Sequence, residues 1–174
     1  SLIDLYEVGK LSGLTEVLFI ERCLNLLKPG GRMGIVLPEG VLNNSNLQKV
    51  RDFVESKAKI LLITSIPQDV FIASGATVKP SLLFFKKFTI GEAETWNAIA
   101  QQADKNIRGK YANQISEIIE KLNDKTITAS EKKLLKNELK QLEEKIAAEI
   151  KSQIKKDFDY EIPIAEVEKA GISS

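Results

Sequence analysis

The spacing of apolar residues changes near Ile90, and this change divides the chain into two kinds of structure. Before Ile90, short apolar runs alternate with amphipathic stretches and glycine or proline turns, which is typical of strands alternating with helices. After Ile90, apolar residues recur in steps of three and four, which is typical of α-helix. We therefore expect an α/β domain over residues 1–90, a helical hairpin over 91–159 and a short tail over 160–174.

The first domain is expected to open with a helix, a strand, a second helix and a second strand. These elements should cover residues 15–28, residues 33–37, the segment after Ser45 up to about Lys57, and residues 60–66. Thr15 can cap the first helix, and Pro29 and Gly30 can end it. One stripe of this helix is polar and the remainder is apolar, so we expect most of it to be buried. The polar stripe is Glu21, Arg22, Asn25 and Lys28, and the apolar remainder is Leu18, Phe19, Leu24 and Leu27.

A third strand is expected over residues 82–87, and its direction follows from the segment before it. Residues 67–81 show no helical period, whereas a parallel crossover normally needs a helix of about a dozen residues. The third strand should therefore run antiparallel to the others. Three strands make a poor sheet on their own, so we expect the later half of a larger α/β sheet.

The second domain is expected to be an antiparallel pair of helices joined by a turn over residues 123–127. Thr128 and Glu131 have the spacing of a capping box, which marks the start of the second helix. Long amphipathic faces of this kind either pack within the chain or present an apolar seam to another subunit. The sequence leaves both alternatives open.

Composition excludes several classes of chemistry. The chain has no histidine and a single cysteine, Cys23, so a histidine base, a His-ligated metal and an intramolecular disulfide are excluded. The formal charge of +1 gives no global attraction to nucleic acid. No apolar run approaches the roughly 18 residues of a membrane span, so no membrane partner is expected and the cytoplasm is the default compartment.

Two segments carry a resemblance to a known family. Residues 18–42 read LFIERCLNLLKPGGRMGIVLPEGVL, and residues 67–87 contain Phe71, Gly75, Thr77 and Pro80 before the run LLFFKK. Together these segments resemble the later part of the methylase domain of adenine-N6 DNA methyltransferases, and most closely the modification subunit of type I restriction-modification systems. The similarity covers about residues 14–88, and residues 160–167 are weakly similar to a stretch that follows the methylase core.

This resemblance implies a Rossmann-like fold, a seven-stranded sheet with one reversed strand, which binds S-adenosylmethionine and methylates adenine N6 in DNA. It also implies that this chain lacks two elements of the family. The glycine-rich cofactor loop and the Asn/Asp-Pro-Pro-aromatic motif do not occur, because Gly30 and Gly31 precede a strand and no Pro-Pro exists. We therefore expect no catalytic residue, no cofactor-binding residue and no metal ligand here, no S-adenosylmethionine binding by this fragment, and no activity in isolation. DNA, a specificity subunit and a restriction subunit are the partners that the resemblance implies.

The functional edge of the sheet is expected at the carboxyl ends of its parallel strands, where ligands of open α/β sheets bind. In the related enzymes an aromatic residue of the loop before the reversed strand stacks on the extruded adenine, and Phe71 matches it by position. Gly75 and Thr77 are candidates for approaching DNA phosphate, and Lys79, Lys86 and Lys87 for facing the duplex. Each has a structural alternative: Phe71 can anchor the loop, the Gly75 segment can be an ordinary turn, and the lysines can keep the strand soluble.

Two functions from different classes remain open at this point. The first is the later portion of an adenine-N6 DNA methyltransferase. The second is a non-catalytic module that displays the helical hairpin for subunit assembly or DNA contact. Two further side chains carry no expected chemistry, since Glu39 suits a polar turn and Cys23 suits inert helix packing.

Overall fold

The computed structural model describes residues 2–75, 77–124 and 126–170. The chain forms two compact units. One unit contains the residues up to Ala93 together with those from Glu161 onward, and the other is Glu94–Tyr160.

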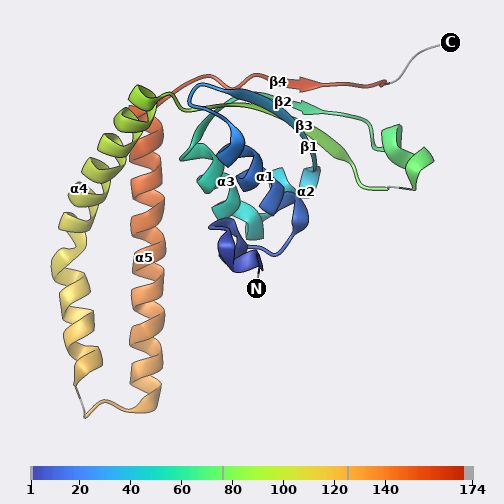
Figure 1. Ribbon diagram of the computed structural model, residues 1–174. Coiled ribbons are helices and arrows are strands. Elements are labelled where there is room, and N and C mark those ends of the chain that lie inside the picture. The colour runs from blue at the N-terminus through green and yellow to red at the C-terminus, as the bar shows by residue number, and fades with distance from the viewer. Residues whose placement is uncertain (1, 76, 125, 171–174) are drawn as a thin grey trace. The chain divides into compact units, whose positions relative to one another are not determined.

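The first unit is built on a four-stranded sheet with the order β1-β3-β2-β4 (Figure 1). Its strands are β1 (Arg32–Pro38), β2 (Ala58–Ser65), β3 (Pro80–Lys87) and β4 (Ile164–Glu166). β3 is antiparallel to both β1 and β2, whereas β4 pairs parallel with β2. The expected α/β sheet with one reversed strand is therefore confirmed, and the reversed strand lies between β1 and β2.

Helices of the first unit lie on one side of this sheet (Figure 1). The α-helices are α1 (Thr15–Leu26), α2 (Glu39–Asn43) and α3 (Gln48–Glu55). Short 3-10 turns occupy Leu2–Leu5, Val8–Lys10, Ser45–Leu47 and Gln68–Ser74, and we call the last of these η4. Because β1 leads into α2 and α3 on this side, the core forms between the sheet and α1 and α3.

The alternation of side chains along β1 and β3 separates the two faces of the sheet. Leu37 and Leu83 are buried on the face that the helices cover. On the opposite face Gly34 pairs with Phe84, and a Cβ at Gly34 would lie only 2.7 Å from the Cε1 atom of the Phe84 ring. The glycine therefore leaves the space that this ring occupies. Val36, on the same face, is half exposed.

The first helix differs from expectation at its start and on its polar stripe. Its N-cap is Leu14, which makes no side-chain cap bond, so the prediction that Thr15 caps the helix is wrong. Glu21 is buried, and its carboxylate accepts backbone N–H bonds from Glu7 at 3.1 Å and Val8 at 2.8 Å. A buried carboxylate is tolerated where donors satisfy it, and the turn before the helix supplies those donors.

The apolar remainder of α1 is only partly covered. Phe19 is 57% exposed and Leu26 is 72% exposed, so the prediction that most of the helix is buried is wrong. The end of α1 is nevertheless held to the sheet, because the Lys87 ammonium donates to the carbonyls of Leu24 and Leu27 at 2.8 and 2.7 Å. A lysine on these terminal carbonyls also complements the negative end of the helix dipole.

The second unit is the predicted pair of helices, α4 (Ile90–Asn123), which starts in the first unit, and α5 (Ala129–Asp157). Thr128 and Glu131 form the expected capping box at the start of α5. Apolar side chains of the two helices interlock along the hairpin, with a buried core of Ile107, Ile118, Leu142 and Ile146. No helix in the described ranges combines the length and apolar character needed to cross a membrane.

The segment after α5 returns to the sheet of the first unit. Ile63 donates its N–H to the Pro163 carbonyl at 3.1 Å, and Val167 donates to the Ser65 carbonyl at 2.9 Å. Three residues of β4 therefore extend the sheet beside β2, within the segment that we expected only as a tail.

Candidate nucleic-acid interface

The ends of β1, β2 and β4 and the start of β3 meet at one edge of the sheet, which we call the rim. β1 and β2 run in the same direction because each is antiparallel to β3. Their carboxyl ends therefore lie together, beside the residue at which β3 begins. Pro38 pairs with Pro80, and Ser65 pairs with Ser81. The rim is the edge at which open α/β sheets bind ligands.

The segment between β2 and β3, residues 67–79, extends from the rim past the ends of the strands, and we call it the rim loop (Figure 1). Its first part is η4, which ends at Gly75 in the left-handed conformation with φ +84°. The Gly75 N–H donates to the Ile72 carbonyl at 2.9 Å, and the Gln68 amide donates to the Thr77 carbonyl. The loop thus contains hydrogen bonds of its own that restrict its conformation.

Four of the six candidate DNA-contacting residues lie in the rim loop, namely Phe71, Gly75, Thr77 and Lys79. Phe71 is half-buried within η4, whereas Gly75 and Thr77 are exposed. A Cβ placed on Gly75 would meet no atom within 4 Å, so the space around this turn is open. Lys79, half-exposed, precedes β3. The loop therefore brings an aromatic ring, an open turn, a hydroxyl and an ammonium group to one edge of the sheet.

Lys79 and Glu39 join the rim loop to the start of α2. The Lys79 ammonium lies 3.5 Å from a Glu39 carboxylate oxygen, and the Glu39 N–H donates to the Lys79 carbonyl at 2.9 Å. Glu39 is thus the first residue of α2 and not only part of a polar turn. Because its carboxylate already balances Lys79, the rim has little excess positive charge from this pair.

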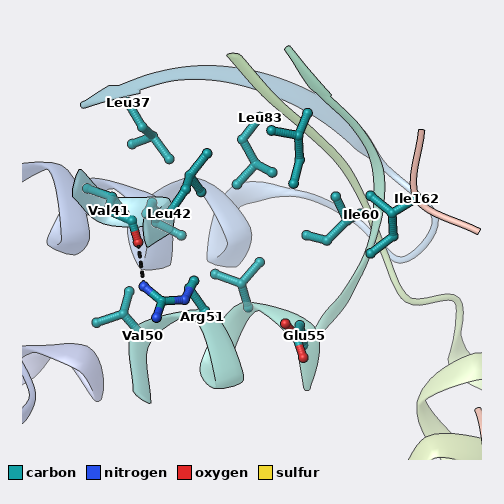
Figure 2. Close-up of a pocket in the computed structure, with 12 residues that line it drawn as sticks. Leu37, Val41, Leu42, Val50, Arg51, Glu55, Ile60, Leu83 and Ile162 are labelled. Carbon is teal, nitrogen blue, oxygen red and sulfur yellow. Dashed lines mark hydrogen bonds between the residues drawn. The ribbon is translucent and has the colours of Figure 1, made fainter. Parts of the chain in front are cut away.

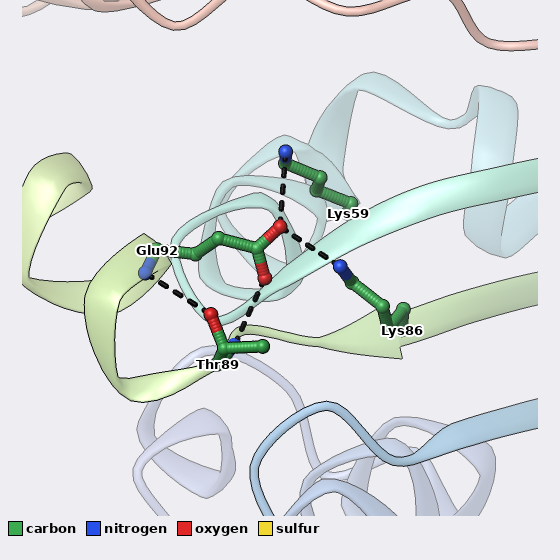
Figure 3. Close-up of polar contacts among 4 residues, drawn as sticks. All are labelled: Lys59, Lys86, Thr89 and Glu92. Atoms are coloured by element: carbon green, nitrogen blue, oxygen red, sulfur yellow. Dashed lines mark hydrogen bonds and ion pairs between the residues drawn. The ribbon is translucent and has the colours of Figure 1, made fainter.

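Lys86 and Lys87 lie at the other end of β3, away from the rim. Lys87 holds the end of α1, as described above. Lys86 lies 2.8 Å from Glu92, which also lies 3.1 Å from Lys59 (Figure 3). The arrangement places both lysines in structural contacts, far along the strand from Phe71.

Glu92 sits at the centre of a polar cluster that fastens the start of α4 to β2 and β3. Its carboxylate accepts the Thr89 N–H at 2.9 Å, and its own N–H donates to the Thr89 hydroxyl at 3.2 Å (Figure 3). Hydrogen bonds from Lys86 and from the Thr89 backbone lower the pKa of Glu92 from 4.5 to about 2. A carboxylate of such low basicity is a permanent anion near neutral pH, so it suits an anchoring role and not proton transfer.

A cavity of about 100 Å³ lies between the sheet and α3. Its walls are aliphatic side chains, including Leu37, Val50 and Leu83, with Ile162 on the side of the returning tail (Figure 2). Arg51 is the nearest cation, and its guanidinium donates to the carbonyls of Val41 and Asn44 at 3.0 and 2.8 Å. The cavity is part of the hydrophobic core, and Arg51 and Glu55 are the charged residues of its otherwise aliphatic lining.

Gly30 and Gly31 lie in the turn between α1 and β1. Gly30 has φ +75° and donates its N–H toward the carbonyls of Lys87 and Phe88 at 3.1 and 3.3 Å. The Gly31 N–H donates to the Lys28 carbonyl at 2.8 Å. Gly30 thus ties the turn between α1 and β1 to the end of β3, whereas the Gly31 bond closes the turn itself.

The described part of the chain also contains no cluster of three or more His, Cys, Asp or Glu residues able to hold a metal ion. Cys23 is a free, half-buried thiol on α1. Neither observation adds a catalytic group to the rim.

Sequence reasoning missed two roles that depend on residues distant in sequence. Arg51 fastens the α2 segment, and Glu21 fastens the turn before α1. Both are charged residues on amphipathic helices, and no local spacing distinguishes them from solvent-exposed ones.

Comparison with known proteins places this chain in a family. The family described as N-6 DNA Methylase matches residues 11–168. "Defense against restriction protein B" of Escherichia phage P1 is 29% identical over 76 residues, which cover 44% of this chain and 3% of the phage protein.

Two solved structures are also similar. A putative class I S-adenosylmethionine-dependent methyltransferase of Listeria monocytogenes is 27% identical with a TM-score of 0.44, covering 51% of this chain and 27% of that one. The type I restriction enzyme EcoKI M protein is 28% identical with a TM-score of 0.41, covering 46% of this chain and 16% of that one. The chain thus spans less than a third of each of these three proteins. Since the family match extends over most of its length, the chain belongs to the N-6 DNA methylase family.

Proposed function

We propose that this chain is the later part of a methyltransferase domain that transfers a methyl group from S-adenosylmethionine to adenine N6 in DNA, within a type I restriction-modification system. The single observation that carries the proposal is the family match over residues 11–168. The helix, the KPGGR turn and the IVLPEGVL segment of residues 18–42, which spans the end of β1 and the start of α2, support the type I assignment. The test is N6-methyladenine formation in DNA by the longest natural protein that contains this chain.

The rim loop is the part of this chain that we assign to DNA. We propose that the Phe71 ring stacks on the extruded adenine, because duplex enzymes must take the base out of the helix and aromatic rings stabilise it there. We also assign Gly75 and Thr77 to phosphate contact, which their exposure allows. Lys79 can exchange Glu39 for phosphate at low cost because its ion pair is partly exposed.

Phe71→Ala in the longer protein tests this assignment. We expect duplex binding to weaken by about 1–3 kcal/mol, the range of base stacking on an aromatic ring, while cofactor binding stays unchanged. The measurements are fluorescence anisotropy with DNA and calorimetry with S-adenosylmethionine. Equal methylation kinetics in wild type and variant would remove Phe71 from the DNA site.

Exposed apolar surface supports a second part of the proposal, that further methylase sequence covers this unit. Phe19 and Leu26 of α1 are mostly exposed, and β1 pairs with β3 along one edge only. A seven-residue edge strand with apolar side chains is normally paired or protected. We therefore propose that the other strands of the methylase sheet add beside β1 and supply the cofactor loop and the catalytic tetrapeptide.

Mixing experiments test this second part. The chain alone should give no heat of binding with S-adenosylmethionine, and it should restore methylation when it is mixed with the separately expressed preceding methylase segment. Phe19→Glu should weaken that assembly, because it places a charge where the helix flank would be buried. A control, Glu94→Gln on α4, should assemble normally. Saturable, tight binding of the cofactor by the chain alone would contradict the proposal.

The helical hairpin is proposed as the contact to the specificity subunit, with the restriction subunit joining the same complex. Its main apolar seam is already used between α4 and α5. Contact must therefore use apolar groups left outside the seam, of which Leu134 and Ile119 are the large exposed ones on the described part of the hairpin. Loss of co-purification with the specificity subunit in Leu134→Glu is the expected result. Normal assembly in that variant would leave the hairpin an internal structural element.

A second candidate function is a non-catalytic module of a protein that counters restriction. The phage relative, whose name records defense against restriction, favours it. The two candidates separate in cells that carry an active restriction system. Protection of DNA that contains no N6-methyladenine would support the module, whereas protection that follows methylation would support the enzyme.

A further inference from the structure

The rim loop carries exposed aliphatic side chains beside Phe71. Ile72 is 58% exposed and Val78 is 56% exposed, on either side of the Gly75 turn. Aliphatic groups in water are unfavourable by roughly 25 cal/mol per Å² of exposed apolar area. A loop that extends beyond the sheet and holds two such groups is therefore suited to contact an apolar surface (Figure 1).

The backbone presents these side chains in a restrained conformation. The Ile72 carbonyl accepts the Gly75 N–H at 2.9 Å, and the residue before Val78, Thr77, accepts a hydrogen bond from Gln68. At the base of the loop, the Ile66 N–H donates to the Pro80 carbonyl at 3.3 Å. Restraint of this kind lowers the entropy cost of ordering the loop when it binds a partner.

The 3-10 geometry of η4 also separates the directions of Phe71 and Ile72. With three residues per turn, successive side chains point about 120° apart around the axis. One side chain can therefore contact an extruded base while its neighbour points elsewhere. Phe71 can thus contact the extruded base while Ile72 contacts the duplex from which the base came.

We propose that Ile72 and Val78 form an apolar wedge that enters the base stack and fills the gap left by the extruded adenine. This inference rests on the proposed function. Extrusion removes stacking on both sides of the gap, and aliphatic side chains inserted between base steps restore part of that apolar contact. The neighbouring Lys79 is placed to approach the flanking phosphate.

The test is a rescue experiment in the longest natural protein that contains this chain, on a duplex with a mapped methylation site. In the Ile72→Ser/Val78→Ser double variant, methylation of the intact duplex should fall by about tenfold, equivalent to about 1.4 kcal/mol. An abasic position opposite the target adenine makes extrusion cheaper, so on that duplex the variant should match the wild type. Fluorescence of 2-aminopurine at the target position should report less extrusion by the variant on the intact duplex only.

Matched variants separate the wedge from other effects. Ile72→Met keeps the apolar bulk and should retain the wild-type rate, and Ile90→Ser removes an exposed aliphatic group from the start of α4 and should also retain it. Equal rates for wild type and double variant on the intact duplex would overturn the wedge. A tenfold loss that the abasic duplex does not rescue would also overturn it, and would instead assign the side chains to a protein contact. A wild-type protein that methylates no DNA would refute the proposed function itself and the wedge with it.

Discussion

Neutralising the Glu92 carboxylate is the perturbation whose effect on stability can be worked most directly from the structure. Glu92 contacts Lys86 at 2.8 Å and Lys59 at 3.1 Å, and its pKa is lowered from 4.5 to about 2. A shift of that size corresponds to an upper limit of about 3 kcal/mol. Because the two ammonium groups remain partly exposed, solvent screening reduces the expected contribution to about 1–2 kcal/mol.

The Glu92→Gln variant isolates the charge. Glutamine keeps an oxygen that can accept the Thr89 N–H, so the cap at the start of α4 can persist while the ion pairs are lost. Urea unfolding at pH 7 should therefore show a free energy of unfolding lower by about 1–2 kcal/mol than in the wild type. Glu94→Gln removes an exposed charge from the same helical turn and should change it by less than about 0.5 kcal/mol.

The pH dependence has a defined sign. Because folding lowers the pKa of Glu92, its stabilising contribution is complete above the unfolded value of 4.5 and is lost as the pH falls toward about 2. The difference in stability between wild type and Glu92→Gln should therefore be constant at neutral pH and shrink as the pH is lowered through this window. Equal stability of the Glu92 and Glu94 variants at pH 7, or a difference that persists undiminished at pH 2, would refute the reasoning.

Three further substitutions test the packing and capping within each of the two units. Gly34→Val places a Cβ 2.7 Å from the Phe84 ring and should lower the melting temperature, with a cost of about 1–3 kcal/mol as the ring is displaced. Ile146→Ala empties a fully buried position of the hairpin and should cost about 2–5 kcal/mol, measured as loss of helical circular dichroism on urea titration. Thr128→Ala removes the N-cap that accepts the Glu131 N–H, and should cost about 1 kcal/mol in the same titration, whereas Thr128→Ser should cost little.

Local sequence patterns predicted those parts of the fold that short-range physics controls. The steps of three and four after Ile90 predicted both long helices, and the Thr128 and Glu131 pair predicted the start of α5, because a capping box lies within one turn. The absence of a helical period between β2 and β3 predicted the reversed strand, because chain length limits how that connection can cross the sheet.

The burial and the partners of individual side chains were predicted less well, because they depend on residues that are distant in sequence and meet only in the folded chain. On α1, Glu21 was expected to be exposed and Phe19 to be buried, and the structure shows the reverse. The Glu21 carboxylate is buried and accepts N–H groups of residues 7 and 8, whereas the Phe19 ring is mostly exposed. Helical spacing defines which residues share a face, but only the packed chain decides which face meets the core. The same limit applies to Lys86 and Lys87, whose partners lie on α4 and α1.

The sequence alone determined that this chain contains strands followed by a helical hairpin, and that it lacks histidine chemistry. These properties follow from residue type and spacing along the chain. The tertiary structure decided that β3 lies between β1 and β2, that the tail adds a strand beside β2, and that Lys79 meets Glu39 at the rim. Such contacts join residues far apart in sequence, and their free energy exists only after the chain has folded.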